Sequence, residues 1–184
     1  MKNRKRYEIL NGLPVYGPMY IPVSANSDIS YSEGFVVKFY KSDNTEWVAN
    51  FKSGWTDYSL VADYPEQNKI VVIAFGQGYI MTPDQYEPLG TFGVNIKTAL
   101  TSSNNQIIAA DDVRLYIINE HAKLFYSERI SLDGIKDLAI NGNIISGLSC
   151  YPSGNKDEWL PFTLDLETKE ITGGSYFSFF GGTE

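Results

Sequence analysis

The stretch Ile70-Val71-Val72-Ile73-Ala74-Phe75, followed by Gly76-Gln77-Gly78 and then by Tyr79-Ile80-Met81, decides the fold class. A run of apolar, mostly β-branched residues is typical of a buried strand, and the glycines after it are typical of a hairpin turn. These residues therefore predict an antiparallel hairpin with its turn at Gly76-Gln77-Gly78. They do not form a phosphate-binding loop, because no third glycine at the fingerprint position and no Gly-Lys-Ser/Thr motif follows.

Apolar runs of the same character occur along the whole chain, and clusters of polar turn residues separate them. They are residues 14–23, 35–40, 46–51, 58–62, 106–110, 114–119, 124–130, 144–151 and 159–166. Asp133-Gly134 and Asn141-Gly142 are pairs that two-residue hairpin turns favour. Helical periodicity is nearly absent, and its best candidate is one turn at Tyr86–Leu89. The pattern predicts an all-β fold of serial antiparallel hairpins.

Four of these strands recur at nearly constant spacing, with starts at Phe35, Ile70, Gln106 and Asn143, which are steps of 35, 36 and 37 residues. Each is followed by a second strand that carries an aromatic residue, and then by a third segment that precedes the next unit. A fixed period is the sequence signature of repeat architectures. We therefore expect four hairpin repeat units between residues 35 and 174.

Units of this order, the last of which ends in DLETKEITGG at residues 165–174, resemble blades of β-propellers of the WD-repeat and quinoprotein kind. The resemblance covers Phe35 to Gly174, and the Gly-His and Trp-Asp signatures of the WD family are absent from it. It implies a propeller-like fold, small or incomplete, that presents its loops at one face. A β-sandwich or a barrel of serial hairpins is the alternative that the same strand spacing allows.

Length and charge restrict the classes of partner. The 184 residues, 43% of them hydrophobic, predict one all-β domain spanning residues 1–184. Four of the 15 basic residues lie in the first six positions, so the rest of the chain carries 11 basic and 22 acidic residues. An acidic surface repels nucleic acid and anionic membrane, so neither is expected as a partner. No apolar run is long enough to span a bilayer, and the single cysteine fits a cytoplasmic location.

The chain is poor in residues that carry catalysis. His121 is the only histidine and Cys150 the only cysteine, so a zinc site with three or four such ligands is excluded and no cofactor is implied. Cys150 follows an apolar strand and is interpreted as a small buried residue. We therefore expect a non-enzymatic protein-binding module, specifically an acidic immunity-type protein that neutralises a basic partner.

The candidate partner-binding residues are carboxylates in predicted turns or at strand starts: Asp111, Asp112, Glu120, Asp133 and Glu158. The alternative function is a hydrolase that acts on glycans or small esters through carboxylates. That alternative requires at least two of Asp111, Asp112, Asp133 and His121 within hydrogen-bond reach in one pocket.

The C-terminal segment holds Tyr176, Phe177, Phe179 and Phe180 without a clean strand alternation. We interpret it as a closing strand that completes a sheet edge, or as a segment that docks a partner.

Overall fold

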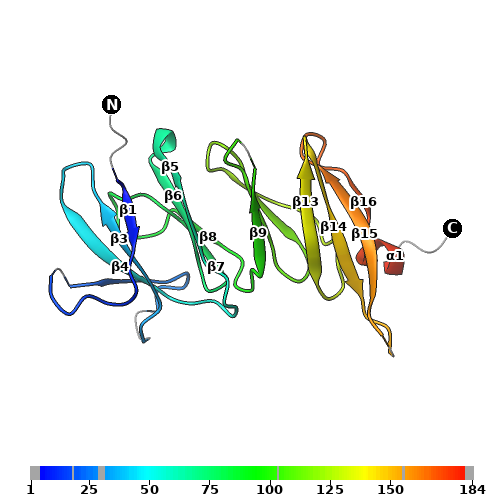
Figure 1. Ribbon diagram of the computed structural model, residues 1–184, viewed down its shortest axis with the longest axis horizontal. Helices are drawn as coiled ribbons and strands as arrows, with labels where there is room; N and C mark the ends of the chain where they lie inside the picture. The colour runs from blue at the N-terminus through cyan, green and yellow to red at the C-terminus, as the bar shows by residue number, and fades with distance from the viewer. Residues whose placement is uncertain (1–4, 18, 29–31, 103, 155, 181–184) are drawn as a thin grey trace. The chain divides into compact units, whose positions relative to one another are not determined.

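The computed structural model describes residues 5–17, 19–28, 32–102, 104–154 and 156–180 (Figure 1). Its internal contacts divide the chain into two compact units, Met1–Asn95 and Ile96–Glu184. Each unit contains two four-stranded β-sheets, so the predicted all-β fold is confirmed. The single domain over residues 1–184 stays a prediction, and the two units are described separately below.

The N-terminal unit has one irregular and one regular sheet. In the first sheet, β3 (Phe35–Tyr40) pairs antiparallel with β1 (Tyr7–Ile9) and β4 (Glu46–Phe51), and β2 (Ile21–Val23) adds to β4 in parallel. The second sheet follows chain order and is antiparallel throughout. Its strands are β5 (Leu60–Tyr64), β6 (Lys69–Ala74), β7 (Gln77–Met81) and β8 (Gly90–Phe92), and the 3-10 turn η1 (Pro65–Gln67) connects β5 to β6.

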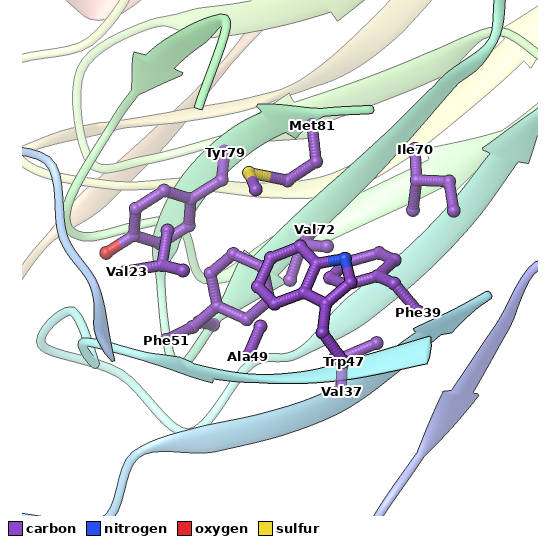
Figure 2. Close-up of a cluster of buried hydrophobic side chains, with 11 residues drawn as sticks. Val23, Val37, Phe39, Trp47, Ala49, Phe51, Ile70, Val72, Tyr79 and Met81 are labelled. Atoms are coloured by element: carbon purple, nitrogen blue, oxygen red, sulfur yellow. The ribbon is translucent and has the colours of Figure 1, made fainter. Parts of the chain in front are cut away.

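Alternate side chains of β3 and β4 pack against those of β6 and β7 in one apolar core (Figure 2). The Phe39 and Trp47 rings lie 4.9 Å apart, and those of Phe51 and Tyr79 lie 5.0 Å apart. The polar tips of the large aromatics are satisfied: the Trp47 indole donates to the Pro83 carbonyl oxygen at 2.8 Å. Because side chains alternate between the two faces of a strand, each of the two sheets of this unit has one apolar face, and these faces form the shared core.

The hairpin of β6 and β7 turns one residue earlier than the sequence predicts. Phe75 and Gly76 have φ angles of 47° and 95°, and Gln77 and Gly78 already belong to β7. Positive φ at both central residues is the requirement of a type I′ turn, which matches the twist of the strands. The loop before β5 holds this turn, since the Thr56 amide donates to the Phe75 carbonyl oxygen and the Ser59 hydroxyl accepts from the Phe75 amide.

The C-terminal unit has two antiparallel sheets that both follow chain order. The first holds β9 (Thr98–Thr101), β10 (Ile107–Ala110), β11 (Leu115–Ile118) and β12 (Leu124–Tyr126). The second holds β13 (Ile135–Asn141), β14 (Ile144–Tyr151), β15 (Glu158–Asp165) and β16 (Ile171–Gly173), and helix α1 (Ser175–Phe180) comes last. Ile108 and Ile117 of one sheet share an apolar core with Ile145, Phe162 and Leu164 of the other.

The segments that begin at Phe35, Ile70, Gln106 and Asn143 correspond to β3, β6, β10 and β14. Each of these strands lies next to an edge strand of its own sheet. No helix forms at Tyr86–Leu89. The interpretation of the aromatic C-terminus as a closing strand is wrong for Ser175–Phe180, which form α1; β16 completes the sheet edge instead.

Neither helical segment in the described part of the chain is long and apolar enough to cross a membrane.

Candidate interaction surface

One end of the C-terminal unit gathers most of the predicted partner-binding residues. Because the strands of each sheet alternate in direction, the β10–β11, β12–β13 and β14–β15 connections all emerge at the same end, as does the segment after β16. We call this end the loop face. It consists of residues 111–114, 127–134, 152–154 and 156–158 together with α1, and it holds Asp111, Asp112, Asp133 and Glu158.

Gly134 joins three parts of the loop face. Its amide donates to the Asp112 carbonyl oxygen at 2.7 Å, and its own carbonyl oxygen accepts from the Cys150 amide at 2.8 Å and from the Ser131 hydroxyl at 2.6 Å. Its φ of 134° lies in a region that only glycine adopts without strain. The Asp133-Gly134 pair therefore acts as a junction between loops, because the glycine permits a backbone geometry that brings these groups together.

Asp111 and Asp112 stabilise the fold of the loop face. The Asp111 carboxylate accepts hydrogen bonds from the Val113 and Arg114 amides at 2.7 and 2.8 Å and from the Tyr116 hydroxyl at 2.6 Å. These bonds satisfy the turn that connects β10 to β11, as aspartate commonly does in turns. Asp112 forms an ion pair with Lys97 at 2.5 Å. Both carboxylates thus have intramolecular partners before any other protein is present.

The carboxylates of Asp133, Asp157 and Glu158 differ from those of Asp111 and Asp112 in their contacts. All three are exposed, and among the described residues their carboxylates make no ion pair or hydrogen bond. Burial raises the pKa of the Cys150 thiol, the negative charges of Asp157 and Asp133 raise it further, and the positive charge of Lys136 lowers it. The loop face therefore carries three exposed carboxylates without an ion pair among the described residues, together with the cations of Arg114, Arg129 and Lys156.

Aromatic side chains continue the loop face beyond these charges. Glu158 lies opposite Tyr151 in the β14–β15 register, and the Tyr151 ring lies 6.1 Å from that of Phe179. The Phe179 ring in turn lies 4.8 Å from that of Phe180, and these two phenylalanines are 55% and 62% exposed. Exposed aromatics of this size are over-represented in protein interfaces, because they bury a large area at a small entropic cost.

Buried hydroxyl groups fix α1 to the second sheet of this unit. The Ser175 hydroxyl donates to the Cys150 carbonyl oxygen at 2.6 Å and accepts from the Leu132 amide at 3.0 Å, and its amide donates to the Ser149 hydroxyl at 2.8 Å. The Arg129 guanidinium lies 5.1 Å from the centre of the Tyr176 ring. The exposed phenylalanines are therefore presented by an anchored helical turn.

Glu120 lies at the opposite end of the same unit, in the turn between β11 and β12. Its carboxylate accepts from the Gln106 side-chain amide at 2.9 Å, and this bond lowers the pKa of Glu120. His121 beside it is exposed. The structure therefore brings together four of the five predicted partner-binding residues and leaves Glu120 apart from them.

The hydrolase alternative needs at least two of Asp111, Asp112, Asp133 and His121 in one pocket. The Asp111 carboxylate is bound within its own turn, Asp112 pairs with Lys97, and His121 lies at the other end of the sheets from both. Cys150 is buried, and its raised pKa opposes formation of the nucleophilic thiolate. Within the described residues, no group of three or more His, Cys, Asp or Glu side chains is placed to hold a metal ion.

Sequence reasoning missed a polar network in the N-terminal unit. The Arg6 guanidinium donates to Asp63 and to Asn68, both at 2.6 Å, and the Asn68 side-chain amide donates to Asp84 at 2.8 Å. Asp84 also accepts from the Ser42 amide and hydroxyl at 2.8 Å, and these bonds lower its pKa. No local motif contains these residues, because the network connects the ends of strands that are distant in sequence.

The apolar run at residues 14–23 forms a strand only at Ile21–Val23, and the described residues before β2 form an exposed apolar loop instead of the expected strand. Val15 and Met19 are each 86% exposed, and Tyr16 is 90% exposed. A signal for it exists in the sequence, since no charged residue occurs from Ile9 to Ser27 although charged residues make up 20% of the chain.

No known protein family matches the chain, and no curated protein matches it in sequence. The geometry of its surfaces therefore carries the functional argument.

Proposed function

We propose that this protein is a non-enzymatic protein-binding module whose binding site is the loop face of the C-terminal unit. One observation carries the proposal: the loop face holds both the exposed carboxylates of Asp133, Asp157 and Glu158, which form no ion pair among the described residues, and the exposed rings of Phe179 and Phe180. A contact surface with an aromatic centre and a charged periphery is the usual composition of a specific protein interface.

The sign of these charges specifies the partner. A basic protein fits a face with six acidic residues (Asp111, Asp112, Glu128, Asp133, Asp157, Glu158) and three basic ones (Arg114, Arg129, Lys156), and the net charge of −7 over the whole chain would accelerate the encounter. This is the combination expected of an immunity-type protein that neutralises a basic toxin. Salt should weaken the attraction between exposed charges, because screening at high ionic strength shortens its range to a few ångströms.

Two features support the finer proposal of a propeller-like arrangement of the sheets. The sheets β5–β8, β9–β12 and β13–β16 each run from first to last strand in chain order, as propeller blades do. Within the C-terminal unit, the first strands β9 and β13 also contact each other. The sheet of β1 to β4 departs from this pattern in two ways. Its edge strand β2 pairs in parallel with β4. Its strand β3 also runs in the direction of β7 and not of β6, since Ser42 after β3 bonds to Asp84 after β7.

The test uses two charge-reversal variants of the full chain. The loop-face variant carries Asp133→Lys, Asp157→Lys and Glu158→Lys, and the matched control carries Glu120→Lys, Glu167→Lys and Glu170→Lys at the opposite end of the same unit. Each is immobilised and exposed at low salt to the basic secreted proteins encoded beside its gene. We expect the wild type and the control to retain one such protein, the loop-face variant to lose most of it, and about 0.5 M salt to weaken the binding of the wild type without abolishing it.

The proposal fails if no basic protein is retained, or if both variants lose the partner equally. Equal loss would mean that total charge alone drives the association. A third variant, Phe179→Ser with Phe180→Ser, tests the aromatic part of the face, and it should weaken binding at high salt as well as at low salt because apolar contacts are not screened.

A further inference from the structure

The outer edge of β1 in the N-terminal unit is an open strand edge. β1 pairs with β3, and the Leu10 amide donates to the Val36 carbonyl oxygen while the Tyr40 amide donates to the Arg6 carbonyl oxygen, both at 3.0 Å. Antiparallel pairs alternate between residues that exchange both hydrogen bonds and residues that exchange none. Arg6, Glu8 and Leu10 therefore bond to β3, whereas the amide and carbonyl groups of Tyr7 and Ile9 point to the other side.

A hollow of about 500 Å³ lies along this edge. Its walls are the β1 segment from Lys5 to Ile9 together with Asp63 and Pro65, at the end of β5 and the start of η1. Among the described residues, no other strand pairs with this side of β1. The edge therefore has both unpaired backbone groups and room for another chain.

The side chains around the hollow differ in chemistry. Ile9 is 50% exposed although it lies on the same strand face as Tyr7, which packs on the core. At the other side of the hollow, Asp63 pairs with Arg6 at 2.6 Å, and their side chains are 27% and 14% exposed. Burial raises the pKa of Asp63 despite the adjacent guanidinium, so its ionised form would gain from a second cation.

We infer that the edge of β1 binds an extended peptide segment by strand addition, with an aliphatic side chain of the peptide on Ile9 and a lysine or arginine side chain at Asp63. Backbone hydrogen bonds to Tyr7 and Ile9 hold the segment, and the two side-chain contacts select its sequence. Lys5 and Arg6 also line the hollow, and they already pair with Glu8 at 3.1 Å and with Asp63 at 2.6 Å. A basic segment is favoured over an acidic one because an incoming carboxylate would face Asp63 in a partly buried position. This site is in the other unit from the loop face and stands independently of the proposed function.

The probe is a capped six-residue peptide of alternating valine and threonine with one threonine replaced by lysine, compared with the same peptide carrying glutamate there. Amide hydrogen exchange and NMR shifts of the full chain report where each peptide binds. We expect the lysine peptide to protect the Tyr7 and Ile9 amides and to bind about five- to tenfold more tightly than the glutamate peptide. Absence of protection at these amides, or equal affinity for both peptides, overturns the inference.

Two further measurements separate strand addition from adhesion to the surface. Methylating the peptide backbone nitrogens that face β1 should abolish binding to the unmodified protein, and this result does not depend on the folding of any variant. Ile9→Pro removes an outward amide while retaining the bonds of Glu8 and Leu10 to β3, so it should also abolish binding.

A third measurement tests the selection of the side chain. Asp63→Asn should remove the preference for lysine and leave the affinity of the all-threonine analogue unchanged. Undiminished binding of the methylated peptide would refute the proposed geometry.

Discussion

Replacing Asp111 with alanine tests whether this carboxylate stabilises the loop face or recognises a partner. The substitution removes the acceptor for the Val113 and Arg114 amides and for the Tyr116 hydroxyl. Hydrogen bonds to a charged group contribute about 1.5–3 kcal/mol each when buried, but water can reach the two half-buried amides once the carboxylate is gone. Tyr116 is only 6% exposed, so its hydroxyl loses more. The total should be about 2–3 kcal/mol in the free energy of local opening.

Hydrogen exchange measures this cost at the turn itself and does not require the whole chain to unfold in one step. A loss of 2–3 kcal/mol corresponds to exchange about 30- to 150-fold faster at the Val113 and Arg114 amides. Asp111→Asn retains an acceptor oxygen for both amides and should cost about 1 kcal/mol. Tyr116→Phe should cost a similar amount, and combining it with Asp111→Ala should give less than the sum, since both remove one shared bond. Exchange within twofold of wild type in Asp111→Ala would refute the assignment.

Other substitutions test the backbone, the electrostatics and the core. Gly134→Ala should destabilise the protein by about 1–3 kcal/mol in urea unfolding, because its φ of 134° strains any side chain, whereas Gly154→Ala has no atom within 4 Å of the added carbon and should stay within about 0.5 kcal/mol. A hydrogen bond to Glu8, together with burial and the same negative charge, raises the pKa of Tyr40 from 10.0 to about 12. Since the pKa of Tyr40 is higher in the folded than in the unfolded protein, this stabilisation is complete below pH 10 and disappears as the pH rises through about 12. Glu8→Gln should move the absorbance transition of the Tyr40 phenolate back towards pH 10. An unchanged transition would contradict the role of that bond. Phe39→Ala should cost about 3–5 kcal/mol because the ring is fully buried, measured by thermal unfolding; a cost below 1 kcal/mol would contradict the packing in Figure 2.

The sequence predicts most of the long strands of this fold and misses several of the short ones. β6 and β14 contain enough consecutive apolar or alternating residues to define a strand by themselves. β1, β8 and β16 have three residues each, which is too few for a period of two to be visible. They exist because a neighbouring strand offers unpaired backbone groups, and that information is in the tertiary structure.

The position of the turn after β6 has a similar origin. Gly76-Gln77-Gly78 contains the glycines that a turn favours, yet the chain places Phe75 at positive φ. The loop before β5 forms hydrogen bonds to the Phe75 amide and carbonyl groups, and the Phe75 ring contacts that of Phe35 at 5.9 Å. Contacts from distant segments thus outweigh the local preference of the glycines.

Part of the candidate site follows from the sequence once the strands are counted. In a sheet that follows chain order, every second connection emerges at the same end, so the turn with Asp111 and the connection with Asp133 share an end while the turn with Glu120 takes the other. This deduction needs β12, a three-residue strand that lies within the predicted run 124–130. The sequence does not predict helix α1; in the structure, Gly173 and Gly174 at φ angles of 77° and 92° end the strand before it.

Net charge overstates how strongly the loop face attracts a partner. Asp112 neutralises Lys97, so this pair adds little field at the surface, whereas Asp111 keeps its negative charge although its oxygens are bound within its own turn. The carboxylates that a basic partner meets without an ion pair among the described residues include Asp133, Asp157 and Glu158. The salt dependence of binding should then change in proportion to these carboxylates and not to the acidic residues of the chain as a whole. Because the phenylalanines of α1 adjoin the same carboxylates, affinity that persists at high salt would come from them, and the two contributions are separable by charge reversal on one side and aromatic removal on the other.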